Sequence, residues 1–163
     1  MKWLLTLAFF PALAACEKAR PPEAEAATTV DGWHCFERSP SEPADPQGDV
    51  TFSRHRVKNG VLEVESVHHQ AGQGGATRLT FTPAGDHLEA TINDLPLIVK
   101  LLAPDGSHWT LDSQKSHPTF HEESLVKDGV LTVTSTDAGE VSTHRYLATA
   151  CDNVVAELAK YPR

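Results

Sequence analysis

One stretch decides the fold: Val57-Lys58-Asn59-Gly60-Val61-Leu62-Glu63-Val64-Glu65-Ser66, which predicts a β-hairpin. Asn-Gly between two apolar alternations is a strong hairpin signal, because a type I′ turn needs positive φ at both central residues. A second stretch, Val126-Lys127-Asp128-Gly129-Val130-Leu131-Thr132-Val133-Thr134-Ser135, repeats seven of the ten positions. Duplication of half a domain and convergence of two hairpins on the same turn both account for this echo.

Further runs of period-two alternation extend from these hairpins in both directions. The expected strands cover residues 33–36, 49–57, 61–68, 76–82, 87–93, 97–102, 108–113, 124–126, 130–135 and 141–148. Connections this short force antiparallel neighbours, because a parallel pair needs a crossover of about a dozen residues. We therefore predict an all-β domain, an antiparallel meander of about nine or ten strands that forms a barrel or a sandwich.

A short C-terminal α-helix is expected after the last strand. Asp152 or Asn153 is placed to cap it, and its apolar stripe consists of Val154, Leu158 and Tyr161. The expected strand over residues 97–102 is apolar on both faces apart from one lysine. Such a strand is either covered on both sides, as it would be beneath the terminal helix, or exposes a contact surface.

The N-terminal segment has the layout of a secretory signal, with a positive residue, an apolar run over residues 3–12 and then Leu13-Ala14-Ala15-Cys16. It resembles the lipobox of bacterial lipoproteins. The resemblance implies that residues 1–15 are a signal peptide and that Cys16 becomes the acylated first residue, anchored by several acyl chains such as palmitate. A plain secretory signal with an incidental cysteine and a short membrane helix are the alternatives. The apolar run is shorter than the roughly 20 residues of a spanning helix.

The remainder of the chain divides into a tether and one domain. Residues 16–29 are rich in Ala, Glu and Pro and read as a flexible tether, whereas residues 30–163 form a single β domain with the C-terminal helix. Glu17 follows the expected acylated cysteine, and in lipoproteins of enteric-type bacteria Asp at that place favours retention in the inner membrane. The resemblance therefore implies an outer-membrane location facing the periplasm.

The charge of the chain bears on its partners. With 14 basic and 22 acidic residues the formal charge is −8, which disfavours binding to nucleic acid and to anionic lipid head groups. Membrane attachment is therefore expected through acyl chains and not through a basic patch.

Two cysteines remain if Cys16 is acylated, and they are Cys35 and Cys151. Two leftover cysteines in an exported chain usually pair, so we expect a disulfide that ties the first strand to the last segment. Two free thiols and a metal-binding pair are the alternatives.

The expected architecture, a closed antiparallel barrel followed by a disulfide-tied helix, resembles the lipocalin group, some members of which are lipid-anchored. The Gly-x-Trp of that group is not reproduced, because Gly32 and Trp33 are adjacent. Arg145 on the last expected strand would take the place of the basic residue that packs on the tryptophan. No ligand residue of the group can be carried over.

The nine histidines are the residues that most suggest a functional site, because imidazole binds metal ions. Histidines scattered over the solvent-facing surface, with no metal site, are the alternative. The sharpest metal candidate is the pair His117 and His121, although Pro118 favours a loop over the helix that would bring both to one ion. Motifs for nucleophilic, zinc-dependent or phosphate-binding catalysis are absent from the sequence. No cofactor and no enzymatic activity are therefore expected.

Three functions stay open at this point. The first is a non-catalytic module that binds a protein partner in the cell envelope, in an inhibitor, immunity or assembly role. The second is a lipocalin-like carrier of a small apolar ligand, which requires a barrel cavity of several hundred Å³. The third is metal binding through the histidine-rich surface.

Overall fold

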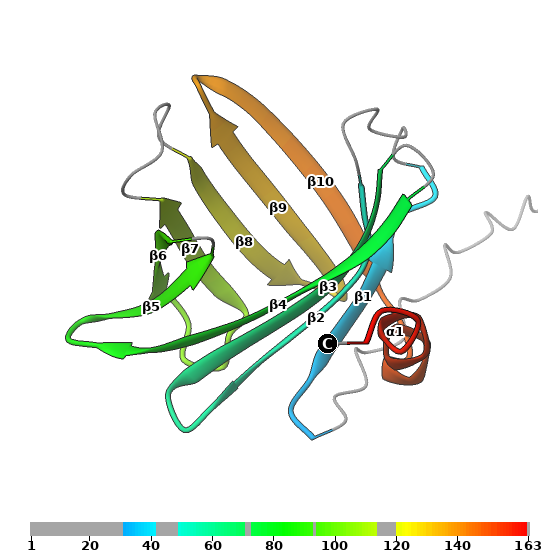
Figure 1. The fold of residues 1–163 in the computed structure, drawn as a ribbon, viewed down its shortest axis with the longest axis horizontal. Helices are drawn as coiled ribbons and strands as arrows, with labels where there is room; N and C mark the ends of the chain where they lie inside the picture. Colours follow the sequence, from blue (N-terminus) through cyan, green and yellow to red (C-terminus); the bar gives the residue numbers. More distant parts are fainter. Residues whose placement is uncertain (1–30, 42–48, 71–72, 93, 114–119, 163) are drawn as a thin grey trace, which may run out of the picture.

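A computed structural model of the chain describes residues 31–41, 49–70, 73–92, 94–113 and 120–162. These residues form ten strands and one helix (Figure 1). The elements are β1 (His34–Arg38), β2 (Asp49–Lys58), β3 (Val61–Gln70), β4 (Gln73–Ala84), β5 (His87–Ile92), β6 (Leu95–Leu101), β7 (His108–Ser113), β8 (His121–Lys127), β9 (Val130–Asp137), β10 (Glu140–Ala148) and α1 (Cys151–Leu158).

The ten strands form a closed antiparallel barrel, which confirms the all-β prediction and decides between barrel and sandwich. Every strand pairs with its neighbours in the sequence, and β1 completes the ring by pairing with both β2 and β10. In β1, Phe36 lies opposite Ser53 of β2 and Ala148 of β10. The barrel has two strands more than the eight of a lipocalin barrel.

The two echoed stretches form the hairpins β2–β3 and β8–β9, as predicted. Asn59 and Gly60 have φ values of 53° and 76°, and Asp128 and Gly129 have values of 51° and 73°. Both central residues of each turn are thus left-handed, as a type I′ turn requires. Because both turns lead from an even-numbered to an odd-numbered strand, they lie at the same end of the barrel, called here the packed end.

Large inward-facing side chains fill the packed end. The predicted alternation of β3, β4, β5 and β7 is confirmed, since the apolar residues of each strand face the interior. The buried cluster there consists of Phe36, Leu62, Phe81, Leu88, Leu97, Val99, Trp109, Leu131 and Tyr146.

A second, smaller core lies outside the barrel, where α1 packs against β1, β2 and β3 (Figure 1). Val154 and Leu158 of α1 are buried against Val67 of β3. Arg78 of β4 donates hydrogen bonds of 3.0 and 2.9 Å to the carbonyl oxygens of Leu158 and Tyr161. A cation at this end complements the helix dipole. In the described part of the chain no helix is long and apolar enough to cross a membrane.

Several details differ from the sequence-based expectations. The helix begins at Cys151 with Ala150 as its N-cap and has no side-chain cap, so neither Asp152 nor Asn153 plays that role. The apolar strand β6 does not lie beneath α1, which covers β1–β3 instead. Leu102, which follows β6, is 55% exposed. Strand β8 begins three residues before the expected position 124.

His55 of β2 is the least expected component of the packed end. Its side chain is fully buried, so the expectation of solvent-facing histidines is wrong at this position. It packs between aromatic rings, with centroid distances of 5.6 Å to Phe36 and 4.5 Å to Trp109. Neither ring nitrogen has a hydrogen-bond partner among the described residues. Burial, with the nearby His34, lowers the pKa of His55 from 6.5 to about 3, against smaller opposing effects of the Gly106 backbone and Asp105.

We expect His55→Leu to stabilise the protein. At pH 7 the variant removes two buried, unpaired nitrogens, which should raise the free energy of unfolding by about 1–3 kcal/mol. The wild type should also lose stability as the pH falls from 6.5 towards 3. In this range His55 is protonated in the unfolded state and neutral in the folded state. Urea unfolding of both proteins at pH 7 and pH 5 measures the difference, which should be larger at pH 5. A less stable variant at both pH values would mean that His55 is held by an interaction that the structure does not explain.

Candidate functional site

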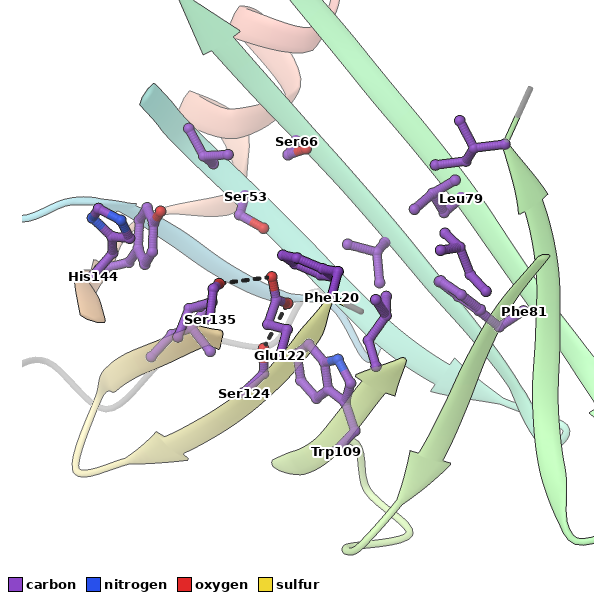
Figure 2. A pocket seen from close by; sticks show the side chains of 18 residues that line it. Ser53, Ser66, Leu79, Phe81, Trp109, Phe120, Glu122, Ser124, Ser135 and His144 are labelled. Carbon is purple, nitrogen blue, oxygen red and sulfur yellow. Dashed lines mark hydrogen bonds between the residues drawn. The ribbon is translucent and has the colours of Figure 1, made fainter. Parts of the chain in front are cut away.

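The barrel encloses a partly open cavity of about 450 Å³ beyond the packed end (Figure 2). Eighteen residues from β2–β10 and the residue before β8 line it. The aliphatic ones are Val50, Val64, Leu79, Ile92, Leu97, Leu111, Leu131 and Val133, and the aromatic ones are Phe81, Trp109, Phe120 and Tyr146. The polar ones are Ser53, Ser66, Glu122, Ser124, Ser135 and His144.

The two echoed hairpins explain why the barrel is hollow at one end only. Counted from the turn, the inward-facing residues of β3 are Leu62, Val64 and Ser66, and those of β9 are Leu131, Val133 and Ser135. Inward side chains therefore become smaller and more polar away from the packed end. A barrel of about eight strands is just wide enough for side chains to fill it, so small side chains in a ten-stranded barrel leave space.

An irregularity in β2 adjusts the lining of the cavity. Val50 and Ser53 both line it although they lie three residues apart, which strict alternation would forbid. The pairing of β2 with β3 shifts register between Val50 and Phe52, so one extra residue is accommodated in β2. As a result Phe52 faces outward and joins the core under α1, while Ser53 faces the cavity.

Glu122 is the acidic side chain of the cavity (Figure 2). It is the second residue of β8 and lies opposite Leu111 of β7 and Ser135 of β9. Ser124 Oγ donates to one carboxylate oxygen at 3.3 Å and Ser135 Oγ to the other at 3.5 Å. Burial raises the pKa of Glu122 above its ordinary value of 4.5, against smaller opposing effects of the two serines and of His121.

The other polar groups of the lining carry no permanent charge. His144 and Tyr146 of β10 are the remaining titratable side chains there, and among the described lining residues none is a lysine or an arginine. The arginines of β2 and β4 lie on the outer face instead, where Arg54 and Arg78 pair with Glu65. The cavity is therefore an apolar, partly aromatic space with one acidic group.

Of the two predicted metal candidates, His117 lies outside the described residues and His121 lies on β8. His121 faces outward and contacts Asp112 Oδ1 through Nδ1 at 2.7 Å, while Glu123 on the same outer face contacts His108 at 2.7 Å. Within the described residues, no group of three or more His, Cys, Asp or Glu side chains is placed to hold a metal ion.

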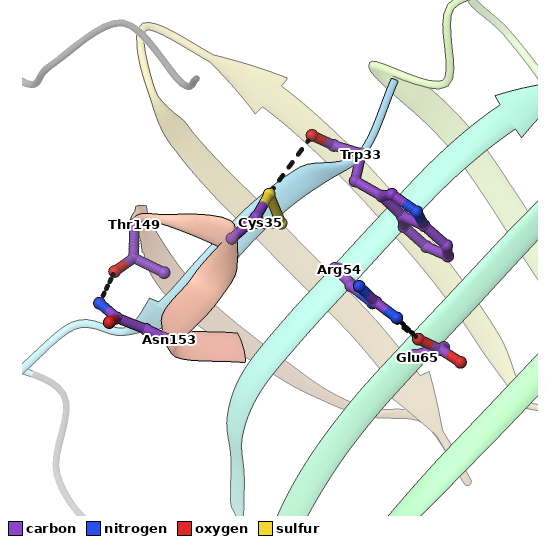
Figure 3. The surroundings of a disulfide bond; sticks show 7 residues. Trp33, Cys35, Arg54, Glu65, Thr149 and Asn153 are labelled. Carbon is purple, nitrogen blue, oxygen red and sulfur yellow. Dashed lines mark hydrogen bonds and ion pairs between the residues drawn. A yellow bond between two sulfur atoms is a disulfide. The ribbon is translucent and has the colours of Figure 1, made fainter. Parts of the chain in front are cut away.

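The expected disulfide between Cys35 and Cys151 is present and joins β1 to the first residue of α1 (Figure 3). Near it, Thr149 donates its backbone N–H to Cys35 O at 3.0 Å. Cys16, the expected lipidation site, lies outside the described residues.

The expected role of Arg145 is wrong. Trp33 lies on the outer face of the barrel, and the guanidinium groups of Arg54 and Arg56 stack on its ring at 4.3 and 4.4 Å from the centroid. Both arginines come from β2 and alternate with inward-facing residues, so they project to the same side as Trp33. Arg145 is exposed, and its backbone carbonyl accepts a hydrogen bond from Ser39.

Sequence reasoning did not single out Glu122 as a cavity residue. The expected strand begins at Ser124, which leaves Glu122 outside it. The signal was the alternation of Phe120, Glu122, Ser124 and Val126, which share one face once the strand is extended. Leu125 interrupts this alternation in the sequence, because it is an apolar residue at an outward-facing position, where it is 39% exposed.

Comparisons of the chain with protein-family models, with characterised proteins and with solved structures found no match.

Replacing Glu122 by glutamine should stabilise the folded protein at neutral pH. The folded-state pKa lies above 4.5, so ionisation of Glu122 costs stability as the pH rises through and beyond that value. Glutamine keeps the shape and cannot ionise, and we expect a gain of about 1–2 kcal/mol in the free energy of unfolding at pH 7.5. The gain should vanish below pH 4.

Urea unfolding of wild type and Glu122→Gln at both pH values measures this gain. Glu123→Gln, at the next and outward-facing position, is the matched control and should show no comparable gain. An equal gain in both variants would mean that the cavity environment is not the cause.

Proposed function

We propose that the protein binds one small, largely apolar molecule inside its barrel and does so as a lipid-anchored protein of the bacterial cell envelope. The observation that supports the binding role is the cavity of about 450 Å³. Pockets for small ligands typically have volumes of about 300–1,000 Å³, mostly apolar walls and a few polar groups that orient the ligand. The lining described above has this composition, with the aromatic and aliphatic side chains as walls and the serines and Glu122 as orienting groups.

This proposal favours the carrier role over a role in binding a protein partner. The exposed large apolar side chains lie on or beside several elements, with Leu102 after β6, Leu125 on β8, Val141 and Leu147 on β10, and Val155 on α1. Nothing in the described structure identifies what would cover them. The interior, in contrast, offers apolar area that is already shaped and available, and filling it with a ligand would remove that area from water.

The cellular location in this proposal comes from the lipobox-like stretch that ends at Cys16. The Cys35–Cys151 disulfide supports it, because structural disulfides persist in oxidising compartments such as the bacterial periplasm. Outer-membrane sorting follows from the residue after Cys16 and belongs to the same proposal.

A cavity-filling substitution should abolish ligand uptake. Val133→Trp places a large side chain in the cavity, whereas Thr134→Trp places the same side chain on the outer face of the same strand. The probe is 2-(2-naphthyl)ethanol, which is uncharged and apolar, titrated into the full chain by calorimetry with a detergent-only blank. We expect one site per chain, at least about tenfold weaker binding in Val133→Trp, and a change of no more than about twofold in Thr134→Trp. Equal binding by all three proteins would refute a ligand site in the barrel, as would failure of the wild type to bind both this alcohol and its amine analogue, 2-(2-naphthyl)ethylamine.

The anchor is tested by labelling cells with radioactive palmitate. Wild-type protein should incorporate the label, and Cys16→Ser should not, because the thiol that accepts the acyl group is gone. The double variant Cys35→Ser/Cys151→Ser should still be labelled, which controls for a general effect of cysteine loss. Labelling of Cys16→Ser would show that the acyl group is attached elsewhere.

A further inference from the structure

The charge distribution of the cavity restricts the class of ligand. Glu122 is the acidic residue among the described lining residues, and no lysine or arginine is found there to oppose it. A ligand carboxylate or phosphate would meet a like charge with no cation to pair with it. In a space of reduced dielectric constant, such a repulsion is stronger than in water. Anionic ligands such as fatty acids are therefore disfavoured.

The hydrogen-bonding state of Glu122 indicates what the site lacks. An ionised carboxylate accepts up to about four hydrogen bonds. Here each oxygen has one serine hydroxyl, at 3.3 and 3.5 Å, and both distances exceed the usual 2.5–3.0 Å of an O–H···O hydrogen bond. The raised pKa has the same origin, since burial disfavours the charged carboxylate and the two serine hydroxyls offset this effect only in part. A donor that carries positive charge would supply both the missing bonds and the missing counter-charge.

The walls around Glu122 suit the rest of such a ligand. Register pairing places Trp109 beside Ser124, and Phe120 precedes Glu122 on the same face of the chain. Figure 2 shows Phe120 and Trp109 in the same lining as Glu122. Aromatic faces attract cations and also bury apolar groups, so they accept both the charged end and the body of an amine.

We propose that the ligand of the barrel is an organic monocation, an amine with an apolar body, whose ammonium group donates hydrogen bonds to the Glu122 carboxylate in the cavity that Trp109 and Phe120 also line. This inference rests on the proposed function, because it assumes that the cavity takes up a ligand. It adds the charge class of that ligand and the residue that selects it.

Three probes of nearly the same shape and different charge test the proposal. They are 2-(2-naphthyl)ethylamine, which is a cation at pH 7.5, the uncharged 2-(2-naphthyl)ethanol, and the anion 2-naphthylacetate. Each is titrated into the wild-type full chain by calorimetry, with a detergent-only blank. We expect the amine to bind at least about tenfold more tightly than the alcohol, and the anion to bind most weakly. This ranking needs no variant and therefore does not depend on the folding of a mutant.

Two variants then assign the selectivity to one residue. Glu122→Gln should lose at least about tenfold in affinity for the amine and change little for the alcohol, because only the ionic interaction is removed. Glu123→Gln removes the same charge from the neighbouring outward position and should leave the affinity for the amine unchanged. Far-ultraviolet circular dichroism confirms that each variant is folded.

The possible outcomes separate this inference from the proposed function. Binding of the alcohol with no preference for the amine, or a preference for the anion, would overturn the inference and leave the ligand site intact. An amine preference that survives in Glu122→Gln would also overturn it, because another group would then be the anion. Failure of all three probes to bind would refute the ligand site itself, and the inference with it.

Discussion

The closure of the ring by β1 is the constraint on which the rest of the structure depends. This strand has five residues, yet it must hydrogen bond to β2 on one side and to β10 on the other. Its contact with β10 joins segments more than 100 residues apart, and such a contact carries a large loop-closure entropy. The Cys35–Cys151 disulfide reduces this entropic cost, because it links β1 to the helix that follows β10 across a separation of 116 residues. In the chain-entropy description a loop of that length contributes about 4–5 kcal/mol.

Closure makes the hollow possible, and the distribution of side-chain size decides where it lies. The packed end supplies the buried apolar area that stabilises the barrel, with Phe36, Leu62 and Phe81 almost fully buried. The cavity end buries less apolar area. It also holds the Glu122 carboxyl group, whose pKa is raised by burial. Such local losses of stability are typical of functional sites, and interactions elsewhere in the fold compensate for them. The outer core under α1 is one such compensation, since it adds a second apolar cluster at β1–β3.

Much of this fold could be predicted from the sequence, and the limits have physical reasons. Turn chemistry is local, so Asn59-Gly60 and Asp128-Gly129 predicted their hairpins correctly. Ring closure is not local, and its signal in β1 was Cys35, whose expected disulfide with Cys151 ties this strand to the segment after β10 without stating that β10 is its hydrogen-bonded partner. The cavity was encoded in the decreasing size of Leu62, Val64 and Ser66, but that pattern has meaning only once the strand count and the packed end are known. The position of Glu122 in β8 could not be predicted for two reasons. Pro118 favours a loop before the strand, and the exposed Leu125 breaks the alternation of polar and apolar residues within it.

The direction in which the chain enters the barrel bears on how a ligand would reach the cavity. Residue 34 begins β1 and lies opposite His55, near the β2–β3 turn, so the preceding chain joins the barrel at its packed end. In the anchored form that we propose, the attachment to the membrane would therefore lie opposite the cavity. A cavity on the side away from the tether would exchange its ligand with the aqueous compartment. That route suits an amine that is charged and soluble in water better than it suits a lipid taken from the bilayer.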